Sequence, residues 1–322
     1  EGEGVHEIPV GPVHAGIIEP GHFRFSIVGE PVLKLEERLG YKHKGIEKCF
    51  AGRSVQEGLK LAGRVSGDST CAYAWAYAMA VESLAKSAVP ERAQWLRALL
   101  LERERVANHL GDLGALGNDA AFGFGLAQFL RLKELWLRLN GELFGHRFMM
   151  DAICPGGVRC DVAVAGLDRI RVQCDQIERE VSGLRALYDE HAGLQDRFVT
   201  LGRVTPKVAA QLGLTGMAGR ASGIHIDLRR GLGWAPYEQL KFNIASHCNG
   251  DVAARVLMRF EELFESLRLI REIAMRLPPG PVCAELSSCD LQGQSVGWVE
   301  GWRGEVLVAL EVDAEARIRR CH

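Results

Sequence analysis

The spacing of hydrophobic and polar residues changes along the chain and begins with a strand-like pattern. Residues 22–28 place Phe23, Phe25 and Ile27 at alternate positions, which is typical of a half-buried strand. A Gly-Glu pair then gives a turn signal, and residues 32–35 predict a second short strand. The N-terminal part is therefore expected to contain a small β hairpin.

From about residue 70 the pattern becomes helical. Residues 70–87 alternate alanine with larger side chains, and the high helix propensity of alanine favours a helix that packs closely on all sides. Pro90 suits the first turn of a following helix, which is predicted to run to about Leu116. Further helices are predicted at 126–144, 162–194 and 250–277. Such long segments with short connections predict a central helix bundle.

The last part of the chain returns to strand patterns. Residues 295–300, 305–312 and 317–321 predict a β-meander with turns between the strands. The sequence ends directly after the last of these strands, which suggests a fragment or a continuation. The predicted fold class is mainly α with peripheral β (α+β), and the chain is expected to form one continuous domain. Its three parts are an N-terminal β segment (1–60), a helical-bundle core (61–280) and a C-terminal β-meander (281–322).

Composition excludes several classes of function. The 322 residues carry a formal net charge of -2, so the basic excess typical of nucleic-acid binding is absent. No apolar run reaches the roughly 18 residues of a membrane span, and no signal region is present, so membrane association is expected to come through partner subunits. The nine cysteines are odd in number, widely scattered and without a C-x-x-C pair. They predict a reducing compartment, no disulfide framework and mostly structural thiols.

Six segments concentrate polar residues or glycines, and each has both a functional and a structural interpretation. In the first, Glu19 could relay protons and His14 or His22 could line a pocket, or all three could belong to a simple turn. In the second, residues 64–71 precede the alanine-rich helix. Asp68 or a neighbouring hydroxyl could cap that helix, whose N-terminus also favours anions.

The remaining segments have mainly structural interpretations. His109 lies in mid-helix without a second histidine four residues on, so it is expected to be a core histidine and not a metal ligand. Gly156 and Gly157 permit close backbone approach or positive φ but form no dinucleotide fingerprint. The charged residues of 219–229 predict internal ion pairs, and 300–304 predicts a hairpin turn.

Taken together in their order, these segments carry a family resemblance. The quoted motifs are G-P-x-H, E-P-G-H-F-R-F, E-R-x-x-N-H-x-x-D, P-G-G-V, R-A-S-G-x-x-x-D-L-R and E-G-W-R-G. They are similar to the large subunit of group-4-type, membrane-bound [NiFe] hydrogenases and formate hydrogenlyases, and to the quinone-side large subunit of complex I. The resemblance covers residue 11 to the end of the chain.

The resemblance implies a mainly helical fold with peripheral sheet and a place in a larger complex. A small subunit with an iron–sulfur cluster would dock against the chain, and membrane subunits would hold it on the cytoplasmic, inner face of the cell membrane. The complex I branch implies NAD- and quinone-linked chemistry for such a complex. The chain alone is expected to bind no cluster or flavin, and alone it is expected to be inactive.

One departure from the family concerns the metal site. Active hydrogenases read R-x-C-G-x-C before the alanine-rich helix, where this chain has Arg64, Ser66, Gly67, Asp68 and Ser69. A serine hydroxyl replaces a thiolate poorly at low-valent nickel and iron, so no metal ligand is assigned and a NiFe centre is not expected. The family's second cysteine pair would lie beyond the last residue of this chain.

The same loop also departs from complex I. The tyrosine that the family would place against a quinone headgroup aligns near Gly67, so that ligand is missing, although His14 fits the family's other quinone-side histidine. A quinone therefore stays an open candidate as ligand.

Three hypotheses remain open. The leading one is a subunit of a hydrogenase- or complex I-related redox complex that lacks the nickel site and couples redox change or protonation to membrane subunits. The second is an active quinone-reducing or hydrogen-evolving subunit, and the third is a structural scaffold for the iron–sulfur subunit. The expected site consists of the catalytic candidates Glu19, His22, Arg64 and Asp68, and of the cavity-lining candidates His14, Ser66 and Ser69.

Overall fold

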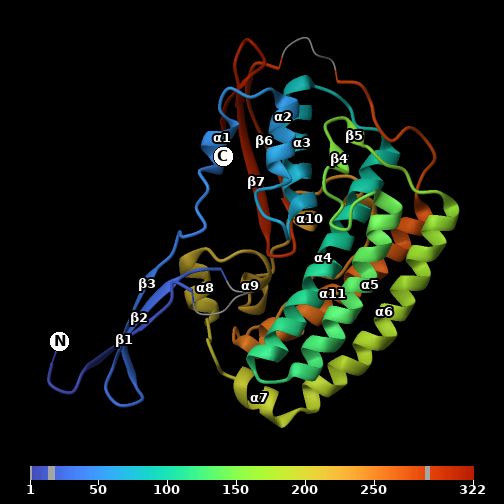
Figure 1. Ribbon diagram of the computed structural model, residues 1–322. Coiled ribbons are helices and arrows are strands. Elements are labelled where there is room, and N and C mark those ends of the chain that lie inside the picture. The colour runs from blue at the N-terminus through green and yellow to red at the C-terminus, as the bar shows by residue number, and fades with distance from the viewer. Residues whose placement is uncertain (1, 14–18, 287–290) are drawn as a thin grey trace. The chain divides into compact units, whose positions relative to one another are not determined.

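The computed structural model describes residues 2–13, 19–286 and 291–322 (Figure 1). Contacts within the chain divide it into two compact units, Glu1–Cys49 and Phe50–His322, and each is described by itself.

The first unit is a three-stranded antiparallel sheet in the order β1-β2-β3. Its strands are β1 (His6–Val10), β2 (His22–Ile27) and β3 (Val32–Arg38), followed by the short helix α1 (Ile46–Phe50), which ends just inside the second unit. The predicted hairpin is confirmed as β2 and β3. Strand β1 was not predicted, because a five-residue segment containing proline gives little strand signal.

The second unit is built around long helices that lie side by side (Figure 1). They are α3 (Thr70–Ala85), α4 (Glu91–Asp119), α5 (Gly123–Phe144), α6 (Val164–Glu190) and α11 (Val252–Arg276), and the shorter helix α2 (Val55–Ala62) packs on α3. Helix α4 packs against both α5 and α11, and α6 packs against α11. The predicted bundle of long helices is confirmed.

One predicted helix, 162–194, is in fact two. Helix α6 ends at Glu190, and α7 (Ala192–Phe198) begins after His191, whose backbone is extended. The His191 side chain accepts a hydrogen bond from the backbone N–H of Leu194 at 3.2 Å. The histidine thus caps α7, and the apolar periodicity on both sides of it concealed the break.

Short elements between the long helices were not predicted. They are β4 (Ile153–Cys154), β5 (Gly157–Val158), α8 (Pro206–Leu212), α9 (Gly216–Ala221), α10 (Leu228–Gly231) and the 3-10 turn η1 (Tyr237–Gln239). None is long enough to give a clear hydrophobic period.

The predicted C-terminal meander is confirmed as β6 (Gly293–Glu300), β7 (Glu305–Val312) and β8 (Ile318–Cys321), all antiparallel. This sheet packs on α3, most of whose residues are buried. A Cβ atom at Gly297 of β6 would lie only 1.9 Å from the carbonyl oxygen of Ala76. The alanines of α3 and this glycine therefore let strand and helix backbones approach closely.

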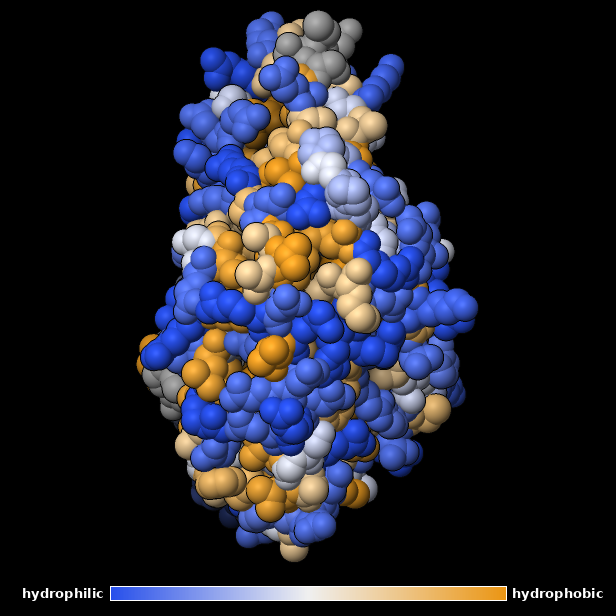
Figure 2. Space-filling view, turned by 90° about the vertical axis from the view of Figure 1, so that its right-hand side faces the viewer, coloured by the Kyte–Doolittle hydropathy of each residue, from blue (hydrophilic) through white to orange (hydrophobic). Residues whose placement is uncertain are grey.

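The fold is mainly α with small peripheral antiparallel sheets, as predicted. The three-part division at residues 60 and 280 stays a prediction. In the described part of the chain, no helix has both the length and the apolar character that crossing a membrane requires. Figure 2 shows one face of the molecule, on which patches of apolar side chains lie among predominantly polar ones.

Candidate functional site

The loop that leads into α3 gathers its polar side chains around one carboxylate. Ser66 and Ser69 both donate hydrogen bonds from Oγ to Oδ1 of Asp68, at 2.5 and 3.0 Å. Arg303, from the turn between β6 and β7, pairs with Oδ2 at 2.9 Å. Partial burial would raise the pKa of Asp68, but these donors outweigh burial and hold the pKa below its ordinary value. Asp68 is therefore ionised at neutral pH, and both serine hydroxyls act as its donors.

The first N–H groups of α3 are bound by a carboxylate from α4. Glu104 accepts hydrogen bonds from the backbone N–H of Cys71 at 2.6 Å and of Ala72 at 3.1 Å, one on each oxygen. Ser69 occupies the N-cap position, but its side chain makes no capping bond. Ser69, one of the expected candidates, is therefore the N-cap residue, but Glu104 of a neighbouring helix accepts the hydrogen bonds that a capping side chain would accept.

Glu104 is the group of this site whose charge changes near neutral pH. Burial raises its pKa to about 8, although the N–H donors of Cys71 and Ala72 work in the opposite direction. Asn108, one turn further along α4, donates to the backbone oxygens of Asp68 at 2.5 Å and of Glu104 at 2.9 Å. The amide thus ties the Asp68 loop to the helix that carries Glu104.

A small pocket opens between these groups and α5. Its lining includes Gly67, Asp68, Glu104, Asn108, Lys133 and Phe148. Burial lowers the pKa of Lys133, while nearby carboxylates oppose that effect. The pocket therefore combines an ionised carboxylate, a carboxyl group that titrates near neutral pH and a partly buried amine.

Arg64, at the start of this loop, pairs with Asp151. Its guanidinium forms two parallel hydrogen bonds with Asp151, at 2.8 and 2.7 Å, and donates to the Lys60 carbonyl. The ion pair raises the pKa of Arg64 and lowers that of Asp151. This contact fixes the loop before α3 to the segment before β4.

The other predicted site residues lie in the first unit. His22 begins β2 and is half-buried, with its Nδ1 atom 3.4 Å from the Gly11 carbonyl oxygen. Glu19 is exposed, and His14 lies outside the described residues. The structure thus brings Ser66, Asp68 and Ser69 together. The grouping of the first-unit residues with them stays a prediction.

The thiol nearest to this loop is Cys71. It is buried, and burial together with the Glu104 carboxylate raises its pKa well above the ordinary value. Cys71 is therefore a neutral thiol at physiological pH, and a neutral thiol is a poor metal ligand. Among the described residues, no group of three or more His, Cys, Asp or Glu side chains is arranged to hold a metal ion.

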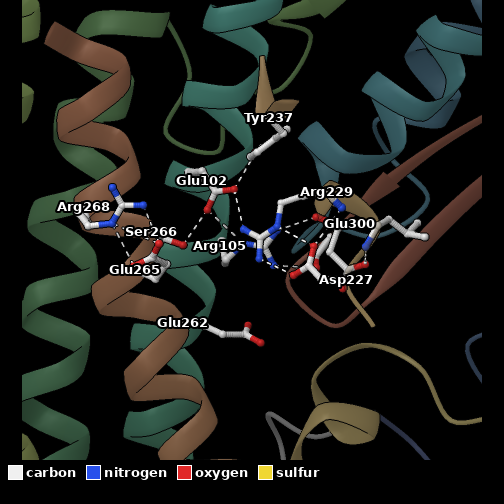
Figure 3. A network of polar contacts seen from close by, with 12 residues as sticks. Glu102, Arg105, Asp227, Arg229, Tyr237, Glu262, Glu265, Ser266, Arg268 and Glu300 are labelled. Carbon is white, nitrogen blue, oxygen red and sulfur yellow. Dashed lines mark hydrogen bonds and ion pairs between the residues drawn. The ribbon is translucent and has the colours of Figure 1, made fainter. Parts of the chain in front are cut away.

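Helix α4 also carries part of a second polar centre, a buried ionic cluster (Figure 3). Glu102 accepts hydrogen bonds from Arg229 at 2.9 Å, from the Tyr237 hydroxyl at 2.6 Å and from Ser266 at 2.7 Å. Burial would raise the pKa of Glu102, but Arg105 and Arg229 lower it to about 2. Glu102 is therefore held as a carboxylate.

The cluster continues through a second arginine. Arg220 of α9 pairs with Glu262 of α11 and with Glu300 of β6, both at 2.7 Å. Glu262 also lies 3.0 Å from Nε2 of His109, whose pKa is lowered by burial. Asp227 completes the cluster, pairing with Arg229 at 2.6 Å. These contacts join α4, α9, α10, α11 and β6 through charged side chains.

The charges of this cluster do not balance. It contains four carboxylates (Glu102, Asp227, Glu262, Glu300) and three guanidinium groups (Arg105, Arg220, Arg229). Burial and the neighbouring Asp227 raise the pKa of Glu300, so Glu300 is the carboxyl group most ready to take up a proton.

Sequence reasoning found part of this arrangement. The predicted ion pairing of segment 219–229 and the core position of His109 are confirmed. The roles of Glu102 and Glu104 were missed. The available signal was the run Glu-Arg-Glu-Arg inside an otherwise apolar helix segment, because charged residues between apolar stretches require internal partners.

Comparison with known proteins identifies the class. Residues 121–296 match the family described as respiratory-chain NADH dehydrogenase, 49 Kd subunit. The chain belongs to this family, in the superfamily of hydrogenase and complex I large subunits.

The chain has relatives on both the hydrogenase side and the complex I side of this superfamily. The chain is 30% identical over 316 residues to the carbon monoxide-induced hydrogenase of Rhodospirillum rubrum, covering 98% of this chain and 88% of that protein. It is 33% identical over 299 residues to formate hydrogenlyase subunit 5 of Escherichia coli (strain K12), covering 92% of this chain but only 52% of that protein.

A solved structure is also similar. It is a chain of the membrane-bound sulfane sulfur reductase, an archaeal respiratory membrane complex, with a TM-score of 0.93 and 27% sequence identity. The alignment covers 99% of this chain and 88% of that chain.

Proposed function

We propose that this chain is the large subunit of a membrane-associated redox complex related to hydrogenases and complex I. It works without a nickel–iron centre at the loop before α3. In its place, the pocket beside Asp68 and Glu104 couples redox change or protonation to membrane subunits.

The observation that carries the proposal is the state of the donor atoms before α3. Where the resemblance to hydrogenases leads us to expect cysteines, this chain has Ser66 and Ser69, and their hydroxyl groups donate to Asp68. The thiol of Cys71 is buried and protonated. Low-valent nickel and iron require soft thiolate ligands, which this loop does not supply. The residues present therefore do not fit the family's metal centre.

The pocket is suited to hold and release protons. Asp68 stays ionised through Arg303 and the two serines, whereas Glu104 changes charge near neutral pH. The two groups are connected through Asn108. Protonation of Glu104 would remove a negative charge from the N-terminus of α3, so the protonation state of Glu104 affects how this helix is capped.

The relatives support a place for this chain in a multi-subunit membrane complex. Large subunits of this superfamily work in complexes, and we propose an iron–sulfur small subunit and membrane subunits as partners of this chain. Such partners would hold it on the inner face of the cell membrane. Glu19, His22 and Arg64, with His14 and a quinone ligand, remain proposed members of the site.

The first test is elemental analysis for nickel and iron on the full-length subunit purified with its partners. The proposal expects nickel at background and iron only in the amount that the iron–sulfur subunit accounts for. Nickel near one atom per subunit would overturn the proposal and establish a hydrogenase with altered ligands.

The second test uses Asp68→Asn, with Asp168→Asn as control, because Asp168 forms only an exposed ion pair on α6. Turnover of the complex is assayed with protons, a quinone analogue and a sulfane sulfur compound as acceptors. We expect Asp68→Asn to leave assembly intact and to lower turnover at least tenfold, and the control to do neither. Unchanged turnover in Asp68→Asn would support a purely structural scaffold instead.

A further inference from the structure

Two cysteines from distant parts of the chain face each other at the surface of the second unit. Cys154 ends β4, and Cys283 lies in the segment that follows α11. Their Sγ atoms are 3.9 Å apart. A disulfide has an S–S length of about 2.0 Å, so a modest movement of the two side chains would bring the sulfurs into bonding distance.

The backbones that carry these thiols are held together independently of the sulfurs. The N–H of Val158 donates to the Val282 carbonyl at 2.9 Å, and that of Ala284 donates to the Gly156 carbonyl at 3.0 Å. A Cβ atom at Gly157 would lie 2.1 Å from the Val282 oxygen. The glycines of the P-G-G-V motif are therefore required for the close approach that their sequence pattern predicted.

A buried ion pair between Arg97 and Glu82 holds the turn between β4 and β5. Arg97 donates to the carbonyl of Cys154 at 2.7 Å and to that of Gly157 at 3.1 Å. Glu82, the partner of Arg97, accepts a hydrogen bond from the N–H of Gly156 at 2.7 Å. The buried ion pair therefore holds the turn that carries Cys154, and the two backbone hydrogen bonds join the Cys283 segment to that turn.

The two thiols differ in access. Cys283 is exposed, and Cys154 is buried to 9% exposure, but both line the same surface groove together with Pro155 and Arg159. Burial, reinforced by the neighbouring Cys283, raises the pKa of Cys154 to about 11. An external reagent therefore meets Cys283 first, and Cys154 is positioned to react only with a group already attached to Cys283.

We propose that Cys154 and Cys283 form a dithiol site that reduces disulfides of small thiols and is itself converted to an intramolecular disulfide. The Cys283 thiolate attacks one sulfur of the external disulfide and releases the first small thiolate. The Cys154 thiolate then attacks Sγ of Cys283 and releases the second. Each protein thiol loses a proton, each leaving thiolate gains one, and the external disulfide accepts the two electrons.

This inference does not rest on the proposed function, since the pair lies apart from the Asp68 pocket in sequence and uses no residue of it. It also agrees with a reducing compartment, because the site is a free dithiol until a disulfide reaches it.

The test uses oxidised glutathione and the full-length chain, with non-reducing peptide mass spectrometry as the readout. The wild type is expected to give a Cys154–Cys283 crosslinked peptide, with two glutathione molecules released for each crosslink. Cys154→Ser is expected to stop at a glutathione adduct on Cys283, and Cys283→Ser to leave Cys154 unmodified. Cys248→Ser removes another exposed cysteine and is expected to leave the crosslink unchanged.

Three outcomes would overturn the proposal. One is a stable glutathione adduct on Cys283 of the wild type without crosslinking. Another is pairing of either cysteine with a different one, such as Cys160 or Cys289. The third is glutathione on Cys154 in the Cys283→Ser variant, which would contradict the order of the two steps.

Discussion

The Glu104 carboxylate of α4 accepts the backbone N–H of Cys71, the second residue of α3, at 2.6 Å. A buried group on one long helix thereby caps the start of another. The N-terminus of a helix favours negative charge, whereas burial disfavours it. The balance between these effects places the titration of Glu104 near neutral pH and makes it the most informative residue of the site.

The first prediction concerns the pH dependence of stability through Glu104. Its folded pKa of about 8 lies above the ordinary value of 4.5, so the folded chain holds a proton that the unfolded chain releases. Stability from this group is therefore full below about pH 4.5 and is lost as pH rises through 8. As pH rises across this range, we expect the free energy of unfolding of the wild type to fall by up to about 5 kcal/mol relative to that of Glu104→Gln. Denaturant unfolding at a series of pH values measures it.

Glutamine is a suitable replacement because it resembles the protonated acid in shape. A constant difference between the two proteins from pH 5 to pH 9 would show that Glu104 stays ionised, and the helix N-terminus would then have outweighed burial.

The second prediction concerns Glu102, whose contribution to stability is lost at low pH and not at high pH. Arg105 and Arg229 hold the pKa of Glu102 at about 2, so its contribution to stability is present above about pH 4.5 and lost as pH falls toward 2. We expect Glu102→Gln to be destabilised by about 3 kcal/mol at pH 7 and by progressively less between pH 4.5 and pH 3. Unfolding midpoints in urea over this range check the trend. An equal loss at pH 7 and pH 3 would contradict it.

The third prediction addresses the ionic cluster as a whole. Arg220→Met leaves Glu262 and Glu300 without their shared cation in a buried setting. Removing one partner of a buried ion pair costs about 3–5 kcal/mol, because the remaining charge is uncompensated. We expect that loss at pH 7, and a smaller one at pH 5, where the orphaned carboxylates take up protons more easily.

A matched control is Arg138→Met, which breaks an exposed pair with Glu134 on α5. Such surface pairs contribute less than about 1 kcal/mol. Equal destabilisation by both substitutions, measured by guanidinium unfolding, would show that the cluster contributes no more than a surface pair.

Much of the fold could be predicted from sequence because its signals are local. The 3.6-residue period marks the long helices, and the alternation of β6 and β7 marks the meander. The P-G-G-V motif indicated close backbone approach, which Gly156 and Gly157 provide. The break between α6 and α7 at His191 was not predicted, because a capping histidine between two apolar segments leaves their periodicity intact.

The site could be predicted less well from the sequence, because it depends on contacts between residues that are far apart in the chain. The grouping of Ser66, Asp68 and Ser69 followed from their sequence proximity, but the pairing of Asp68 with Arg303 spans most of the chain. Glu104 caps α3 from 33 positions away. No local pattern specifies which helix terminus a buried carboxylate will meet, so its role became visible only in three dimensions.

The last prediction tests the packing of the C-terminal sheet on α3, which positions Arg303 beside Asp68. At Gly297 a Cβ atom would lie 1.9 Å from the backbone oxygen of Ala76 and 2.8 Å from the backbone nitrogen of Ala80. Because backbone atoms cannot move aside as a flexible side chain can, we expect Gly297→Ala to destabilise the protein by about 3 kcal/mol or more.

Gly183 provides the contrasting control on the exposed side of α6, where a Cβ atom would meet nothing within 4 Å. There alanine removes the entropic cost of glycine in a helix, and Gly183→Ala should stabilise the protein by about 0.5–1 kcal/mol. Thermal and urea unfolding of both variants give the comparison. If Gly297→Ala were as stable as wild type, the sheet could shift on α3 without penalty. Arg303 would then not be held in place by this contact.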